Sequence, residues 1–194
     1  MKYAGIFTAF SLFAAATAAS IPMEKREDDK MYPHATFRRW VSTGQLVEDP
    51  QDQLLVVRNN NPAEETTAIV TFDFDPSLEG RTCKLMFELW ARDTSTGSQT
   101  VDVFSTIDPP SSQSMSVAEA SKALVMKMTQ SRGEHMGRIK VPAPGTAEWI
   151  QSYHGMPEFP CPAGQLMGWE FVGVGEDITL QWDIGVTGPT VQVL

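Results

Sequence analysis

Side chains that could do acid–base or metal chemistry are present in this chain, but they form no recognised catalytic pattern. The three histidines, His34, His135 and His154, lack the spacing of a metal site. Acidic residues are numerous enough to supply a carboxylate pair for glycoside hydrolysis. However, Asp73 and Asp75 alternate with phenylalanines, which is typical of a solvated strand face. No nucleophile elbow, zinc-protease motif or phosphate-binding loop occurs in the sequence. We therefore predict a non-enzymatic protein with no catalytic residues, no metal and no cofactor, and keep a glycan-active hydrolase as a less favoured alternative.

The two cysteines, Cys83 and Cys161, are the other residues with a defined chemistry. A zinc site would need further ligands, and no histidine lies at the spacing that zinc sites use. A reactive thiol is disfavoured outside the cell, where cysteines form disulfides, and the N-terminus of this chain indicates export. We therefore predict one disulfide, which would stabilise the fold by about 4 kcal/mol if its geometry is unstrained.

The first residues have the three parts of a secretory signal peptide. Lys2 supplies a positive charge, an apolar run extends from Ala4 to Ala16, and small residues up to Ala19 form a cleavage site. The apolar run is too short to cross a bilayer comfortably. We expect a secreted, extracellular protein without membrane insertion, from which residues 1–19 are removed.

A dibasic pair, Lys25 and Arg26, follows a few residues later. It has two interpretations of nearly equal weight, a processing site for a kexin-type protease or an ordinary exposed pair. Cleavage would remove residues 20–26 as a propeptide. Residues 27–194 would then form a single domain, which is long enough to bury its own core.

The formal net charge of −9 limits the kinds of partner. An acidic chain is a poor ligand for nucleic acid or for an anionic membrane surface. Arg38 and Arg39 are the only basic doublet downstream of Arg26, and we expect them at a solvated strand edge. We expect a cell-wall polysaccharide or an extracellular protein as the partner.

Alternating apolar and polar residues, separated by Gly, Pro and Asx turns, predict nine or ten short strands and little helix. The expected strands lie within 32–41, 54–58, 66–75, 82–91, 100–107, 135–141, 165–172, 178–184 and 190–194. Residues 93–98 are expected to form a polar turn, 147–153 a loop or short helical turn, and 116–128 one helical turn followed by a strand. This spacing indicates an all-β fold, an antiparallel β-sandwich of Greek-key or jelly-roll type.

The best-defined local pattern lies between residues 158 and 182. Pro160 and Pro162 hold the residues before them in an extended conformation, and Gly164 allows a positive φ where the chain leaves this corner. Two alternating runs follow, separated by a glycine turn. They predict an antiparallel hairpin with Trp169 and Trp182 in the core.

Three segments resemble a fungal family of secreted proteins that carry the ubiquitin-three-binding-protein (But-two) C-terminal domain. They are residues 80–87 (GRTCKLMF), 135–141 (HMGRIKV) and 159–164 (FPCPAG), and the resemblance covers roughly residues 66–194. It implies a secreted β-sandwich with a bridge between Cys83 and Cys161, and it supplies no catalytic residues. It also implies structural roles for the motif residues His135, Gly137, Phe159, Pro160, Pro162 and Gly164.

Aromatic residues near position 150 form a candidate binding loop. Trp149, Tyr153 and His154 lie in a segment bounded by glycine and proline, where exposed aromatic rings suit stacking on a sugar. The favoured alternative is that Trp149 closes the end of the sandwich.

We expect a non-enzymatic binding or structural domain at the cell surface or cell wall. A secreted effector or antigen that binds a host or competitor protein is the alternative.

Overall fold

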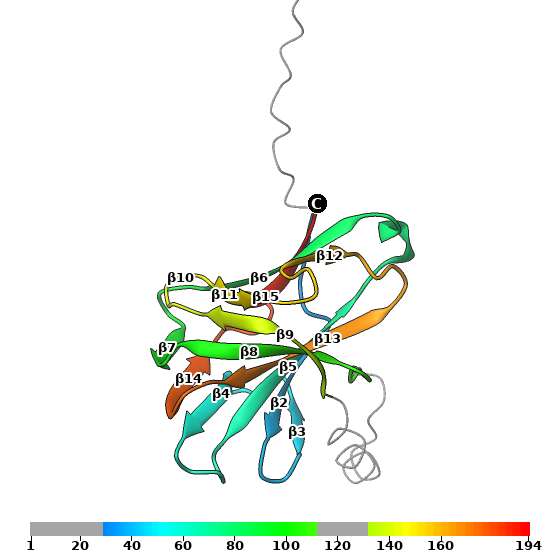
Figure 1. Ribbon diagram of the computed structural model, residues 1–194. Helices are drawn as coiled ribbons and strands as arrows, with labels where there is room; N and C mark the ends of the chain where they lie inside the picture. Colours follow the sequence, from blue (N-terminus) through cyan, green and yellow to red (C-terminus); the bar gives the residue numbers. More distant parts are fainter. Residues whose placement is uncertain (1–28, 112–131) are drawn as a thin grey trace, which may run out of the picture.

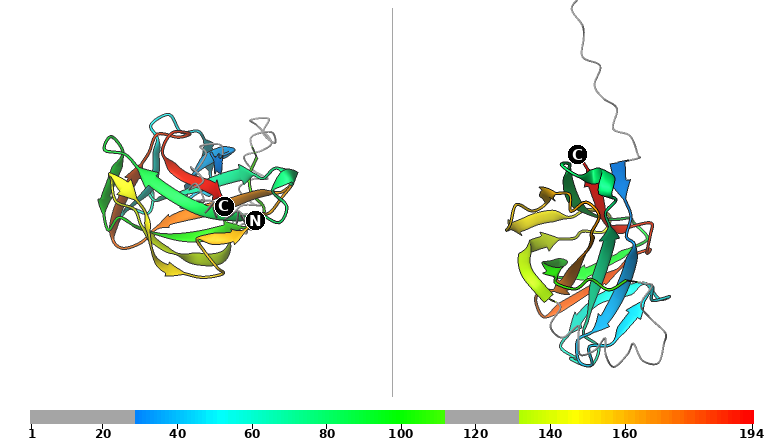
Figure 2. Two further views of the ribbon diagram at one scale, coloured as in Figure 1. Left: turned by 90° about the horizontal axis from the view of Figure 1, so that it is seen from above. Right: turned by 90° about the vertical axis from the view of Figure 1, so that its right-hand side faces the viewer.

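The computed structural model describes residues 29–111 and 132–194, which form a curled β-sandwich of two antiparallel sheets (Figure 1, Figure 2). This confirms the predicted fold class. The predicted signal peptide, the Lys25–Arg26 pair and segment 116–128 lie outside the described residues. Across 29–111 and 132–194, no helix is sufficiently long and apolar to cross a membrane.

The larger sheet has ten strands. Along its main path these are β11 (Glu148–Ser152), β9 (Arg132–Lys140), β8 (Thr100–Thr106), β13 (Leu166–Gly173), β5 (Thr66–Asp73), β4 (Leu54–Asn59), β14 (Asp177–Gln181) and β7 (Thr94–Gly97). β2 (Ala35–Trp40) branches from this path, because it pairs with β5 and also with β3 (Leu46–Glu48).

The smaller sheet has five strands centred on β6 (Thr82–Leu89). β15 (Gly188–Val193) pairs with β6 and in turn with β1 (Lys30–Met31), while β10 (Gly145–Thr146) and β12 (Glu158–Pro160) also pair with β6. Ala147 alone separates β10 from β11, so the chain crosses from one sheet to the other at this residue. A short 3₁₀ turn, η2 (Pro76–Leu78), follows β5.

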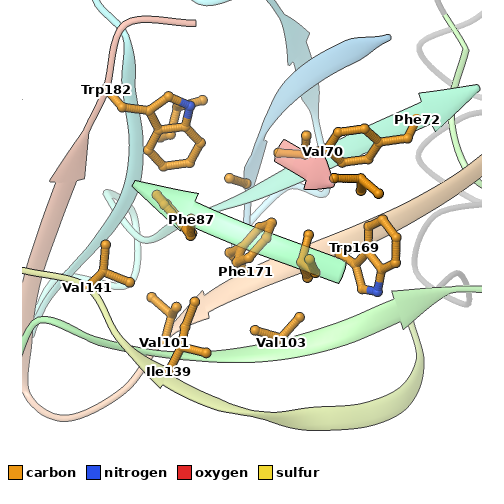
Figure 3. Packing of buried hydrophobic residues seen from close by; sticks show 14 of the residues in the cluster. Val70, Phe72, Phe87, Val101, Val103, Ile139, Val141, Trp169, Phe171 and Trp182 are labelled. Carbon is orange, nitrogen blue, oxygen red and sulfur yellow. The ribbon is translucent and has the colours of Figure 1, made fainter. Parts of the chain in front are cut away.

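The two sheets enclose the main hydrophobic core (Figure 3). β6 alternates as predicted, because its cysteine and every second residue after it are buried. Phe87 of β6 makes edge-on ring contacts with Phe171 and Trp182, at centroid distances of 5.3 and 5.2 Å. Trp169 and Trp182 are both almost fully buried, which confirms their predicted place in the core.

The predicted disulfide is confirmed. Cys83 lies in β6, and Cys161 directly follows β12, the strand that pairs with this part of β6. The backbone N–H of Cys161 also donates to the carbonyl oxygen of Arg81 at 2.9 Å. The bridge therefore joins two segments that are already adjacent in the smaller sheet.

The predicted hairpin of β13 and β14 is not formed. β13 pairs with β5 on one side and with β8 on the other, whereas β14 pairs with β4 and β7. Both edges of β13 are thus occupied, and β14 lies beyond β5 and β4 in the strand order. Proximity in sequence did not decide the pairing here.

Two segments are strands where the sequence predicts a turn or loop. β7 occupies residues expected to form a polar turn, and β11 lies where a loop or helical turn is expected. Both are short, mostly polar strands at the ends of the larger sheet. β11 also has a bulge between Trp149 and Gln151, which interrupts the alternation that would identify a strand.

Candidate functional site

The outer face of the larger sheet, which is turned away from the core, holds a buried carboxylate. Glu170 lies in β13 between the core residues Trp169 and Phe171, and because strand side chains alternate, it points to the opposite face. Its side chain is only 1% exposed. A charge at this depth is costly unless it is paired and hydrogen-bonded.

Three side chains from three other strands supply those partners. Arg132 of β9 donates from Nε to Oε2 and from Nη2 to Oε1 of Glu170, both at 2.8 Å. Arg39 of β2 donates from Nη1 to Oε1 at 3.0 Å, and Thr67 of β5 donates from Oγ1 to the same oxygen at 2.7 Å. Arg39 lies directly opposite Thr67 in the register of β2 and β5. These four residues are the Glu170 cluster.

The partners keep Glu170 ionised. Burial raises the pKa of this carboxyl, but the hydrogen bonds from Arg132 and Thr67 and the charges of Arg132 and Arg39 outweigh burial and hold the pKa below its ordinary value of 4.5. The hydrogen bond to Glu170 in turn raises the pKa of Arg132. A carboxylate that remains ionised at neutral pH is not suited to act as a general acid.

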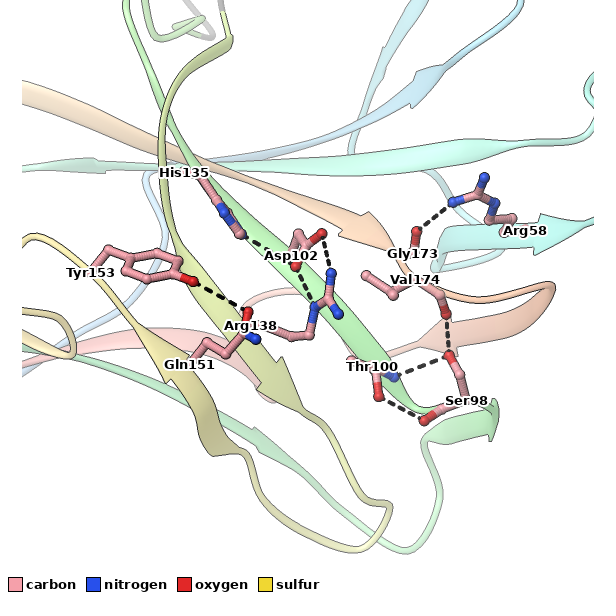
Figure 4. Close-up of polar contacts among 10 residues, drawn as sticks. All are labelled: Arg58, Ser98, Thr100, Asp102, His135, Arg138, Gln151, Tyr153, Gly173 and Val174. Atoms are coloured by element: carbon pink, nitrogen blue, oxygen red, sulfur yellow. Dashed lines mark hydrogen bonds and ion pairs between the residues drawn. The ribbon is translucent and has the colours of Figure 1, made fainter.

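A second ion-pair cluster lies on β8 and β9 of the same face (Figure 4). Arg138 donates from Nε to Oδ1 of Asp102 at 2.7 Å and from Nη2 to Oδ2 at 3.0 Å. His135 Nε2 lies 3.3 Å from Oδ1 without the alignment of a hydrogen bond. Burial raises the pKa of Asp102, but Arg138 and His135 together bring it below the ordinary 3.8. These three residues are the Asp102 cluster.

Phe104 joins the two clusters. It lies opposite Glu170 in the register of β8 and β13. The guanidinium of Arg132 lies 4.8 Å from the centre of its ring, and the imidazole of His135 stacks on it with ring centres 4.8 Å apart. The Glu170 cluster, Phe104 and the Asp102 cluster therefore form a continuous charged row across the outer face. Its bidentate ion pairs fix side-chain positions, which suits recognition rather than proton transfer.

The structure separates the three residues of the predicted binding loop. Trp149 packs against the core and lines a cavity of about 270 Å³ between the sheets, together with Phe87 and Ile139 among others. Tyr153, just after β11, is instead 44% exposed, and its ring centre lies 5.3 Å from that of His135. Trp149 therefore takes no part in an exposed aromatic surface.

His154 follows Tyr153 and belongs to the same region of the outer face. Its backbone has a φ of +54°, and its Nδ1 lies 3.7 Å from Oε2 of Glu134. Tyr153 and His154 thus lie beside the Asp102 cluster, and their binding role stays a prediction. We refer to Arg138, His135, Tyr153 and His154 together as the exposed end of the charged row.

The motif residues of the resemblance occupy different places. His135 belongs to the Asp102 cluster. Gly137 has a φ of +142°, and a Cβ there would lie 2.3 Å from the carbonyl oxygen of Gln151, so only glycine allows β11 to approach β9 this closely. Phe159 lies opposite Cys83 in the pairing of β12 with β6. The remaining motif residues, Pro160, Pro162 and Gly164, form the corner around Cys161, and Gly164 has the positive φ expected for it.

Sequence reasoning missed the arginines and carboxylates of the charged row. Arg38 and Arg39 were expected at a solvated edge, but β2 pairs with strands on both sides. Their side chains are only 13% and 12% exposed and form ion pairs with Asp52 and Glu170. The sequence of β13 contained one indication of the Glu170 cluster, because Glu170 shares its strand face with the uncharged residues Gly168 and Val172. An acidic residue on a face that is otherwise uncharged requires a basic partner from another strand.

Comparison with known proteins identifies the domain. Residues 49–183 match the family model described as the Ubiquitin 3 binding protein But2 C-terminal domain. No match was found among curated proteins. The matched range starts earlier and ends sooner than the resemblance over residues 66–194, and it includes all of the charged row except Arg39. Because the match covers more than half of the chain, the chain belongs to the But2 C-terminal domain family.

Proposed function

We propose that this protein is a secreted, non-enzymatic binding domain that recognises a protein partner through the exposed end of the charged row. The observation that carries the proposal is the position of Tyr153. Tyr153 is 44% exposed, yet its ring lies beside His135, which is itself stacked on Phe104. Tyrosine and arginine are the residue types enriched at the energetic centres of protein interfaces.

Preorganisation supports this role. The guanidinium of Arg138 is fixed by its two hydrogen bonds to Asp102. Asp102, His135 and Arg138 stand on the paired strands β8 and β9. The backbone N–H of Tyr153, just after β11, donates to the carbonyl oxygen of Met136 in β9 at 2.9 Å. A partner that binds them would cause little further loss of side-chain entropy, which is one of the main costs of association.

The family description supports a protein as the class of partner. The matching family model is named for the binding of Ubiquitin 3, so it favours a protein over a polysaccharide for the charged row. The signal-like pattern of residues 1–19 supports export, which would place the partner outside the cell. Neither charged cluster contains a carboxyl poised as a general acid, which supports binding without catalysis.

Site-specific photo-crosslinking tests the interface. A benzoylphenylalanine residue would replace Tyr153 in one sample and Tyr32, an exposed tyrosine before β2, in a matched control. We expect a discrete protein adduct from position 153 and none from position 32. Unlabelled wild-type protein added as a competitor should suppress this adduct, whereas unlabelled Arg138→Ala should suppress it much less. Equal adducts from both positions, or no protein adduct from position 153, would overturn the proposal.

Intact mass tests export and processing separately. We expect the protein from native culture supernatant to have the mass of residues 27–194 with one disulfide, and to gain two alkyl groups only after reduction. Cell-associated protein that retains residues 1–26 would contradict secretion. The proposal of protein binding would then be decided by the crosslinking experiment alone.

A further inference from the structure

A polar pocket outside the charged row has the features of a second binding site. It lies where the turn before β4, the connection from β6 to β7 and the end of β14 meet, and its volume is about 170 Å³. Every side chain that lines it is planar and polar: Gln53, Arg92, Asp93, Gln181 and Asp183. A pocket of this size has room for one small ring rather than for a drug-sized ligand.

The side chains of this pocket are held in place by one another. Asp183 accepts hydrogen bonds from Arg92 Nη2 to Oδ2 at 2.8 Å and from Gln53 Nε2 to Oδ1 at 3.1 Å. Asp93 accepts from the backbone N–H of Trp90 at 2.7 Å and from that of Asp183 at 3.3 Å. The turn that carries Arg92 is thereby fixed to the end of β14.

The backbone at Gln53 is unusual. Its φ is +56°, in the left-handed region that few residues other than glycine occupy. Such a conformation costs free energy and persists only where the surrounding structure imposes it, and it is frequent at binding sites. Here it accompanies a side-chain amide that is directed at the carboxylate of Asp183.

The donors and acceptors of this pocket match hydroxyl groups. Arginine has five N–H donors, of which Arg92 uses one for Asp183. The amide of Gln53 retains its oxygen as an acceptor, and the carboxylate of Asp183 can accept further hydrogen bonds. Two carboxylates disfavour an anionic ligand, and Arg92 disfavours a cation. A neutral ligand with adjacent hydroxyls, each both donor and acceptor, is the class that fits.

An exposed aromatic ring lies next to the pocket. Trp90 is 45% exposed, and the guanidinium carbon of Arg92 is 4.9 Å from the centre of its ring. An indole held at the surface offers an apolar face to the C–H groups of a sugar ring, while its polar neighbours bind the hydroxyls. We infer that this pocket binds one unit of a neutral oligosaccharide or polysaccharide, with Trp90 as the stacking residue and Arg92, Asp183 and Gln53 as hydrogen-bonding residues.

Titration with soluble oligosaccharides tests this site. Calorimetry with the hexamers of β-1,3-glucose, of N-acetylglucosamine and of mannose would measure affinity for wild type, Trp90→Ala and Gln53→Ala. At least one hexamer should bind wild type, and each variant should weaken that binding by about tenfold or more. Tyr32→Ala, which removes an exposed tyrosine outside both proposed sites, serves as the matched control and should bind as wild type does. Failure of all three hexamers to bind wild type, or unchanged binding by Trp90→Ala, would overturn the inference.

A second measurement guards against loss of folding in the variants. In wild type, the side-chain amide NMR signals of Gln53 and Gln181 should shift during titration with the hexamer that binds. Binding that leaves both amide signals in place would assign the sugar to another surface and overturn the inference. Because the crosslinking at Tyr153 involves none of these residues, the two proposals fail or succeed independently.

Discussion

The two clusters of the charged row use the same arginine–carboxylate fork at different depths. Glu170 is 1% exposed and is held by residues from three other strands, whereas Asp102 is 18% exposed and its main partner, Arg138, lies directly opposite it on the adjacent strand. The first arrangement needs several strands in register at once. The second needs only one strand pair, and it leaves aromatic and cationic groups accessible to a partner.

This difference assigns different roles to similar residues. Removing one member of a buried ion pair leaves an uncompensated charge in a low-dielectric environment, so its cost falls on the fold. A partly exposed pair loses less, because water replaces the missing partner. We therefore expect the Glu170 cluster to determine stability and the exposed end to determine recognition.

The largest effect is expected for Glu170→Ala. It leaves the guanidinium groups of Arg39 and Arg132 without their carboxylate, and it should lower the free energy of unfolding by about 3–5 kcal/mol. Urea denaturation followed by tryptophan fluorescence measures this change. A loss below about 1 kcal/mol would show that the two clusters contribute similarly to stability and would contradict the roles assigned to them.

Acid should act mainly through the same carboxylate. Because the pKa of folded Glu170 lies below 4.5, its contribution to stability is complete above that pH and is lost as the pH falls through the folded-state value. The unfolding free energy of wild type should therefore decrease more steeply below about pH 4.5 than that of Glu170→Gln. Urea denaturation across this pH range measures both slopes, and equal slopes would contradict the expected role.

A smaller, salt-dependent effect is expected for Asp102→Asn. The substitution keeps the size of the side chain but removes the charge that pairs with Arg138, at a cost of about 1 kcal/mol. The loss should shrink as salt rises, since a partly exposed pair is screened. Denaturation at low and high ionic strength checks this, with Glu170→Gln as the comparison. A loss of stability that does not change with salt would show that the Asp102 pair behaves like the buried Glu170 cluster.

The smallest effect on stability is expected for Tyr153→Ala. An exposed side chain at the end of β11 should change the unfolding free energy by no more than about 0.5 kcal/mol. Partner binding should nevertheless weaken by about tenfold or more, as at an interface hot spot. Parallel denaturation and binding assays separate the two quantities. A large loss of stability with unchanged binding would assign Tyr153 to the fold.

Strand formation could largely be read from local pattern. The alternation of Cys83, Leu85 and Phe87 identified the core face of β6. Trp169 and Phe171 identified that of β13, and the alternating Ile178 and Leu180 identified that of β14. Short edge strands were harder to predict. The four residues of β7 include no large apolar side chain, and the bulge of β11 interrupts its alternation, so neither strand has a readable period. Trp149 illustrates the limit, since its place between the sheets depends on how β11 docks against β9.

The candidate site could not be assembled in the same way. The alternation of β13 directs Glu170 away from the core, but the partners of this carboxylate, Arg39 and Arg132, lie 131 and 38 residues away in the chain. No local pattern records which strand edges will pair, as the separation of β13 from β14 shows.

The all-β class and the core faces of the main strands follow from residue type and a period of two, and the pairing of Cys83 with Cys161 follows from the presence of two cysteines. The gathering of side chains from β2, β5, β9 and β13 around Glu170 depends instead on the pairing of strands that are far apart in the chain. The physical reason is that pairing follows from competition among all strand edges for backbone hydrogen bonds and core contacts, and this competition is resolved only when the whole sandwich forms.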